Sequence, residues 1–372
     1  MSAQHCRPFD LVSQVFAERL RGCEPSDELR ALVRSPTSDW ERVIGYLDAQ
    51  FVLPAFAGAL QDLGLIGSLD EAVGAFLRTV HAANAERNSQ LCDELSAVIA
   101  VLNQADIEPV LLKGAIRLTD GLYPDQGWRM LRDLDLLVPE ARWADAITGL
   151  QRAGYVYTGE NYQEAPLHRD GWLIEVHREL FKTPRQARLL HGVEMLKNSR
   201  SLKFGEAAVR VPSMDHQIVH LIGHCQIGHY GYAYGRIPFN DRLEAAALLH
   251  WGDENVDWTA ILARFVAAGY RRMLSSFLLS LQDGGLCAVP VPGRIDPLAA
   301  FQHGRIRLQA RSTTIAHVGL WTAYAAAWFK WQMTERDAGQ LRAIKNVKRL
   351  IFERGAIWEM ARTCVGRAPR PW

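Results

Sequence analysis

The hydrophobic positions of the first hundred residues follow a helical period. Within residues 71–103, apolar side chains recur at spacings of three and four, which is the pattern of an amphipathic helix. The series consists of Val73, Phe76, Leu77, Val80, Leu91, Leu95, Val98 and Leu102. Ser38 and Ser68 each precede a glutamate by three residues, and this capping-box spacing predicts two helix starts. We therefore expect a helical N-terminal region over residues 1–104.

After residue 105 the pattern changes to short apolar runs that have the length of strands. These runs lie at residues 109–112, 134–138, 155–157 and 172–176. Helix-like segments at 115–122 and 140–152 separate them, and a hairpin is expected within residues 202–211. Alternating strands and helices indicate a compact core over residues 105–212.

Helical spacing returns after this core. The expected helices cover residues 216–225, 242–250, 258–267, 271–281 and 305–362. The chain therefore predicts an α+β fold, in which the core lies between the helical N-terminal region and a helical C-terminal region over residues 213–372.

Composition adds little to this prediction. The chain has 372 residues, of which 48% are hydrophobic and 22% charged, as is typical of a soluble globular protein. With a formal net charge of +1, no overall field favours a nucleic acid or a membrane as the partner. Six cysteines lie far apart, the N-terminus lacks the apolar core of a signal peptide, and no apolar run approaches the roughly 18 residues of a membrane span. We expect a cytoplasmic protein with reduced thiols.

The chemistry of the core is indicated first by Asp133 and Asp135. Side chains alternate along a strand, so two acids spaced by two residues would lie on the same face. Folding does not require two like charges on a strand that otherwise reads as buried, whereas a divalent metal does. The alternative is a strand end whose solvated acids pair with Arg129 and Arg132.

A second motif precedes the acids. Gly114 follows an apolar run and Lys113, and this combination offers exposed backbone amides and a cation, both suited to holding phosphate. A later strand supplies Glu175 and His177 on one face. Glu175 is a candidate third acid or a half-exposed strand residue, and His177 fits a supporting or nucleotide-contacting role better than that of a base. The order of these motifs favours metal-assisted phosphoryl or nucleotidyl transfer.

Arg129 and Arg132 are the other cations near the paired acids. An arginine can bind phosphate through two parallel hydrogen bonds, so one of them could clamp a triphosphate. If the strand begins at Arg132, its side chain points away from the face of Asp133. This favours Arg129 or Lys113 as the phosphate ligand.

These motifs together resemble the bacterial uncharacterised nucleotidyltransferase family, which belongs to the DNA polymerase beta-type nucleotidyltransferase superfamily. The matching segments are residues 112–114, 122–125, 129, 133–138, 154–155 and 174–177. The resemblance extends over most of the chain, from the helical lead-in before Lys113 to the helices around Asp241. It implies a polymerase beta-type core, a mixed sheet with flanking helices, in which Asp133 and Asp135 match the paired metal ligands and Glu175 matches the third acid.

Several histidines follow the core. His216, His220 and His224 recur every four residues and would line one helical face. Helical histidines at this spacing can bind a transition metal, but core hydrogen bonding or contact with an anionic substrate fits better, because no glutamate completes a zinc-protease motif. Asp241 would open a helix, either as its N-cap or as a substrate-orienting group.

A basic stripe near the C-terminus would be a solvated face or a surface for a phosphate-rich or peptide substrate. It consists of Arg342, Lys345, Lys348, Arg349 and Arg354.

By this resemblance we expect a nucleotidyltransferase dependent on Mg²⁺ (or Mn²⁺) that moves a nucleoside monophosphate from a nucleoside triphosphate, ATP by preference, to a hydroxyl or phosphate. The acceptor would be a small molecule, sugar or peptide in polysaccharide or natural-product tailoring. One alternative is a kinase-like or nucleotide-sugar-dependent transferase. The other is a degenerate nucleotide-binding regulator or assembly partner, because the usual glycine-serine pair of the superfamily reads Gly114-Ala115.

Overall fold

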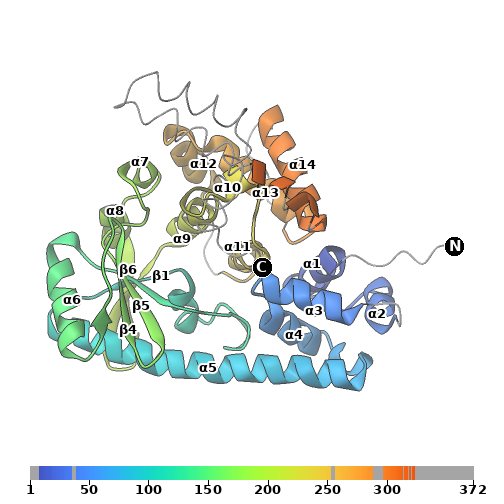
Figure 1. Cartoon of the computed structure of the whole chain (residues 1–372), viewed down its shortest axis with the longest axis horizontal. Coiled ribbons are helices and arrows are strands. Elements are labelled where there is room, and N and C mark those ends of the chain that lie inside the picture. The colour runs from blue at the N-terminus through green and yellow to red at the C-terminus, as the bar shows by residue number, and fades with distance from the viewer. Residues whose placement is uncertain are drawn as a thin grey trace, which may run out of the picture.

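A seven-stranded mixed sheet lies at the left in Figure 1 and has helices packed on both of its faces. The computed structural model describes residues 8–35, 39–252, 256–287 and 296–312, with the short pieces 314–316, 318–319 and 321–322. The strands are β1 (Val110–Leu112), β2 (Leu134–Leu137), β3 (Val156–Tyr157), β4 (Glu164–Arg169), β5 (Trp172–His177), β6 (Ser199–Phe204) and β7 (Ala207–Pro212). Their order across the sheet is β3-β4-β5-β2-β1-β7-β6.

The helices fall into three groups along the chain. The N-terminal group is α1 (Pro8–Leu20), α2 (Asp27–Arg34), α3 (Trp40–Ala49), α4 (Leu53–Asp62), the 3₁₀ turn η1 (Ile66–Ser68) and α5 (Glu71–Gln104). Among the strands lie the 3₁₀ turns η2 (Lys113–Leu118) and η3 (Glu140–Arg142), then α6 (Trp143–Arg152), α7 (Pro184–Ala187) and α8 (Gly192–Lys197). The C-terminal group is α9 (Met214–Gly223), the π-helical turn η4 (His224–Gly228), α10 (Gly231–Tyr234), α11 (Phe239–Trp251), α12 (Trp258–Ala267), α13 (Arg271–Asp283) and α14 (Pro297–Arg311).

Both strand orientations occur at the centre of the sheet. β2 runs antiparallel to β1 and parallel to β5, while β1 runs parallel to β7. The hairpins β4–β5 and β6–β7 complete the two sides. This mixed sheet between helical N- and C-terminal regions confirms the predicted α+β fold.

The two faces of β2 belong to different cores. Leu134 and Leu136 point into an apolar core that the sheet shares with α6 and the second half of α5. Leu137 points the other way, into a core shared with α9, α11, α12 and α13. Asp135 lies on the face of Leu137, because it is two residues away along the strand. The acid therefore faces the C-terminal helices.

The single 34-residue helix α5 connects the N-terminal helices to the sheet (Figure 1). Leu77 in its first half joins the apolar core of α1–α4, and residues of its second half, such as Leu95, lie under the sheet. Asp70 caps this helix by accepting a hydrogen bond from the Ala72 amide at 2.9 Å. The caps of α3 and α5 are therefore aspartates, Asp39 and Asp70, one or two residues after the expected serines.

Most of the predicted strands and helices are confirmed, but the short helices α7, α8 and α10 were not expected. β4 was not expected, and the predicted helix over 115–122 is the shorter 3₁₀ turn η2. The basic stripe at residues 342–354 lies outside the described residues, as does much of the helix expected over 305–362.

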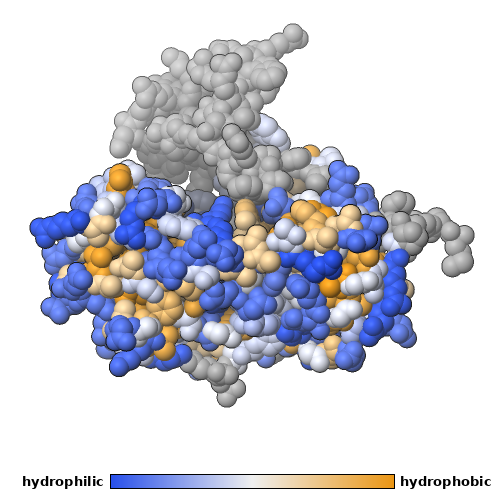
Figure 2. Space-filling view, turned by 90° about the horizontal axis from the view of Figure 1, so that it is seen from below, coloured by the Kyte–Doolittle hydropathy of each residue, from blue (hydrophilic) through white to orange (hydrophobic). Residues whose placement is uncertain are grey.

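No helix within the described part of the chain combines the length and the hydropathy that a membrane span requires. On the face seen in Figure 2, hydrophilic residues lie between smaller hydrophobic areas.

Candidate active site

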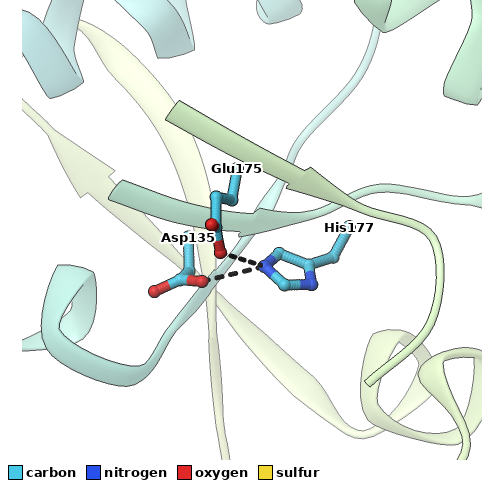
Figure 3. Close-up of side chains that lie close together, drawn as sticks. All are labelled: Asp135, Glu175 and His177. Atoms are coloured by element: carbon cyan, nitrogen blue, oxygen red, sulfur yellow. Dashed lines mark hydrogen bonds and ion pairs between the residues drawn. The ribbon is translucent and has the colours of Figure 1, made fainter. Parts of the chain in front are cut away.

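Asp135 and Glu175 lie side by side on the adjacent parallel strands β2 and β5 (Figure 3). The strand register pairs Asp135 with Glu175 and Leu137 with His177. Since His177 stands two residues after Glu175, both side chains share the face of the sheet that carries Asp135. One ligand atom of each of the three side chains lies within 4.8 Å of the others. We call Asp135, Glu175 and His177 the acid–histidine cluster.

His177 is fully buried and lies close to carboxylates on both sides of its ring. Its Nε2 donates to Asp135 Oδ1 at 2.8 Å and lies 3.7 Å from Glu175 Oε2, while its Nδ1 lies 3.4 Å from Glu164 Oε2 on β4. Burial alone would lower the pKa of His177, but the hydrogen bond to Asp135 and the nearby Glu175 carboxylate outweigh it and raise this pKa to about 9. At neutral pH His177 is therefore a cation that orients Asp135.

Lys113 places its ammonium group between the two carboxylates of the cluster. Its Nζ lies 2.7 Å from Asp135 Oδ1 and 4.0 Å from Glu175 Oε2. Burial alone would lower the pKa of Lys113, but the charges of the two acids raise it above its usual range. Burial alone would likewise raise the pKa of Asp135, but Lys113 and the hydrogen bond from His177 hold it well below its usual range. Lys113 and Asp135 are both charged at neutral pH.

The turn after β1 depends on Gly114. Lys113 has a φ of 49°, in the left-handed region that side chains disfavour, and Gly114 follows it at the start of η2. A Cβ on Gly114 would overlap Leu131 Cδ2. Ala115 is fully buried in the core beneath the sheet. A serine hydroxyl at position 115 would therefore lie in that core.

The first acid of the predicted pair does not lie on the strand. β2 begins at Leu134, so Asp133 and Arg132 belong to the preceding loop, and both line the same cleft as Asp135. Asp133 is half-buried, and burial together with the charge of Asp135 raises its pKa to about 6. Arg132 is exposed, and its Cζ lies 4.8 Å from the centroid of the Phe51 ring.

The acid–histidine cluster borders a cleft of about 730 Å³. All expected site residues except His177 line this cleft. They are Lys113, Gly114, Arg129, Arg132, Asp133, Asp135 and Glu175 from the sheet and its loops, and His220, His224 and Asp241 from the C-terminal helices. Lys182, an exposed cation that the sequence analysis missed, also lines it. The fold thus brings residues from widely separated segments of the chain to one cleft.

Arg129 is held by neighbouring groups. Its Nε and a terminal nitrogen donate to Glu244 Oε2 at 2.9 and 2.8 Å, and a third nitrogen donates to the Met130 carbonyl at 3.0 Å. Asn84 and Asn88 on α5 donate to the Arg129 carbonyl at 3.1 and 2.7 Å. These contacts fix the loop before β2. A phosphate-binding role for Arg129 remains a prediction.

The histidines divide into two environments. His216 pairs with Glu194 on α8 at 3.6 Å, whereas the rings of His220 and His224 meet edge to face with centroids 5.9 Å apart. Burial and the charge of Lys113 lower the pKa of His220 to about 3, and its Nε2 has no hydrogen-bond partner among the described residues. Within that part of the chain, three potential metal ligands converge at the acid–histidine cluster and not on the histidine helix.

Asp241 lies in the first turn of α11, whose N-cap is Pro238, so it does not cap the helix. Burial raises the pKa of Asp241 to about 6.

The sequence analysis also missed Glu164, which stands opposite His177 in the β4–β5 ladder. The alternation of buried Ala165 and Leu167 with more exposed neighbours is the signal that could have revealed β4.

The donor set of the cluster fits a hard divalent cation. Mg²⁺ prefers oxygen ligands and usually takes a few carboxylates together with substrate phosphates. Asp135 and Glu175 offer such oxygens, and Asp133 adds a third carboxylate in the same cleft. The residues therefore suit Mg²⁺ or Mn²⁺, with His177 orienting Asp135.

The structure is a mixed sheet that carries adjacent acids at the wall of a cleft. A comparison with protein families identifies the class to which this chain belongs. The family model described as an uncharacterised nucleotidyltransferase matches residues 36–283, which is two thirds of the chain. The chain belongs to this family, as its motifs predicted. No curated protein and no solved structure matches it.

Proposed function

We propose that the protein moves a nucleoside monophosphate from a nucleoside triphosphate, ATP by preference, to a hydroxyl or phosphate of an acceptor. The observation that carries this proposal is the juxtaposition of Asp135 and Glu175 on neighbouring strands at the wall of the cleft. Membership of the nucleotidyltransferase family supports the same class of reaction.

In the proposed reaction, the acceptor oxygen bonds to the α-phosphorus, the bond from this phosphorus to the bridging oxygen breaks, and pyrophosphate leaves. Asp135, Glu175 and Asp133 would hold Mg²⁺ or Mn²⁺, which neutralises charge on the phosphates. Glu175 either completes this site or takes the acceptor's proton. His177 keeps Asp135 in place, and most of the rate enhancement comes from positioning and electrostatic stabilisation.

The remaining cations of the cleft suit the triphosphate. Lys113 and Arg132 line the cleft next to the acids, and Gly114 follows Lys113 in the turn η2. Arg132 makes no ion pair within the described residues, whereas Arg129 is engaged by Glu244. We assign phosphate contact to Lys113 and Arg132 before Arg129.

The opposite wall of the cleft suits the acceptor. The Nε2 of His220 has no hydrogen-bond partner in the part of the chain that the structure describes, and the ring stays uncharged at neutral pH, so this nitrogen can accept a hydrogen bond from a hydroxyl group. His224 and Asp241 line the same wall. These residues fit a hydroxyl acceptor better than an anionic one.

The position of Ala115 favours an enzyme over a degenerate regulator. The side chain at 115 lies in the core beneath the sheet, away from the cleft. The missing serine hydroxyl therefore gives no reason to expect loss of transfer in this chain.

The test is pyrophosphate release from each nucleoside triphosphate with Mg²⁺ and a panel of sugars, small molecules and peptides. Release of pyrophosphate supports nucleotidyl transfer, whereas a nucleoside diphosphate would identify a kinase-like or sugar-transferring enzyme. Asp135→Asn should abolish release, and Asp145→Asn, which alters an exposed carboxylate on α6, should preserve it. Nucleotide binding without any turnover across the panel would contradict the proposal.

A further inference from the structure

Lys113 occupies the place where the two adjacent carboxylates would share a divalent ion. Its ammonium lies 2.7 Å from Asp135 Oδ1 and 4.0 Å from Glu175 Oε2. Like charges repel strongly at such separations, especially where water is largely excluded. Asp135 is almost fully buried. The ammonium and a divalent ion therefore compete for the same pair of acids.

The carboxylates do not depend on Lys113 for their positions. The pairing of β2 with β5 sets Asp135 beside Glu175, and His177 holds Asp135 Oδ1 from a second direction at 2.8 Å. Without the ammonium group, Asp135 and Glu175 would keep their positions on the paired strands, and Asp135 would have His177 as its remaining neighbouring cation among the described residues. The negative charges of Asp135 and Glu175 would then attract a divalent ion.

The lysine side chain can move while its backbone stays in place. The turn at Lys113 and Gly114 is fixed by the end of β1 and by the packing of Leu131 against Gly114. The flexible stem of Lys113 lines the cleft and is about one fifth exposed, so the ammonium can leave the acids for the open space.

We propose that Lys113 keeps the acid pair closed to a divalent ion until the triphosphate of a nucleotide draws its ammonium away, so that metal and nucleotide bind together. This inference rests on the proposed function, because a polyphosphate is the anion that would attract the lysine. The coupling is reciprocal, since each ligand must raise the affinity for the other by the same factor.

The first test measures Mn²⁺ binding to the free protein by the loss of the electron paramagnetic resonance signal of free Mn²⁺. Lys113→Met should bind Mn²⁺ at least tenfold more tightly than the unaltered protein. Lys182→Met is the matched control, because it removes one positive charge from the same cleft and makes no ion pair with Asp135 in the described residues. Its Mn²⁺ affinity should stay that of the unaltered protein. Equal affinity in all three proteins, or a gain in Lys182→Met as large as in Lys113→Met, would overturn the inference.

The second test uses the unaltered protein and so does not depend on the folding of a variant. The affinity for α,β-methylene ATP, which cannot release pyrophosphate, is measured by calorimetry with Mn²⁺ and with a chelator. The inference expects at least a tenfold gain from Mn²⁺ in the unaltered protein, although free Mn²⁺ alone binds weakly. A strong Mn²⁺ site in the absence of nucleotide would overturn it while leaving the proposed function intact. Failure of both the unaltered protein and Lys113→Met to bind Mn²⁺, with or without the analogue, would instead remove the metal-dependent function itself.

Discussion

His177 donates a 2.8 Å hydrogen bond to Asp135 from a fully buried position on the neighbouring strand. The opposite ring nitrogen lies 3.4 Å from Glu164, so the imidazole is held from both sides. Groups that orient a metal ligand in this way commonly change metal affinity or activity by ten- to hundredfold when they are removed. We therefore expect a positioning role for His177, although it does not line the cleft.

Replacing His177 with asparagine should reduce both the Mn²⁺ affinity measured with α,β-methylene ATP and the rate of pyrophosphate release, each by about ten- to hundredfold. The shorter side chain cannot hold Asp135. His191→Asn is a control, because His191 pairs with Glu179 at 3.3 Å and does not line the cleft. If the two variants, both folded by circular dichroism, had equal Mn²⁺ affinity, the positioning role would be wrong.

Gly114→Ala should destabilise the protein by about 1–3 kcal/mol, because the new methyl group would overlap Leu131 in a packed region. Urea denaturation measures this loss. Gly45→Ala on α3 provides the contrast, since no described atom outside the neighbouring backbone of α3 lies within 4 Å of its Cβ position and alanine is favoured in a helix by up to about 1 kcal/mol. Adding Leu131→Ala should recover part of the stability lost in Gly114→Ala. No recovery would show that the overlap is not the cause.

The sequence predicted those parts of the site that follow from strand alternation. Glu175 and His177 share a face because their strand is regular, and the apolar run before Lys113 forms β1 as expected. Asp133 lies one residue before β2, in the preceding loop, so strand alternation does not set its direction, yet it lines the same cleft as Asp135.

Contacts between distant segments could not be predicted from local patterns. The pairing of Arg129 with Glu244 joins residues 115 positions apart, and it uses the donors that the sequence assigned to phosphate. The position of Lys113 between two acids likewise depends on which strands become neighbours, and the apolar runs do not specify strand order.

Asn88→Ala should loosen the loop before β2. Asn88 is almost fully buried on α5, and its amide donates to the carbonyls of Gln126 and Arg129 at 2.6 and 2.7 Å. The Gln126 carbonyl would lose the Asn88 amide and the Arg129 carbonyl would keep only the donor from Asn84 among the described residues, at a cost of about 0.5–1.5 kcal/mol for each hydrogen bond lost. Hydrogen exchange should speed up in residues 126–133, whereas Gln90→Ala, at an exposed position of the same helix, should leave that exchange unchanged. Unchanged hydrogen exchange in Asn88→Ala would show that the hydrogen bonds from Asn88 do not hold this loop in place.

His81 and Asp125 should make stability depend on pH. His81 Nε2 lies 3.0 Å from Asp125 Oδ1, and the hydrogen bond between them raises the pKa of His81 above 6.5 and lowers that of Asp125 below 3.8. The contribution of His81 is fully present below its unfolded pKa and is lost as pH rises through its folded pKa. That of Asp125 is present above its unfolded pKa and is lost as pH falls through its folded pKa.

His81→Gln should therefore lower the melting temperature more at about pH 5.5 than at about pH 9. The difference should correspond to less than about 1 kcal/mol, because Asp125 is half exposed to solvent. Thermal unfolding of both proteins at the two pH values checks this. An equal loss at both values would show that the histidine acts through packing and not through its charge.

The continuous course of α5 makes the N-terminal and sheet regions inseparable by truncation. A protein that starts at residue 105 would lose α5, whose Leu91, Leu95 and Val98 pack against one face of the sheet. The hydrophobic residues of that face would then be exposed to water. A fragment ending at residue 104 would carry the same stripe with no partner. Proteolysis inside α5 should therefore yield aggregation rather than two independently folding halves.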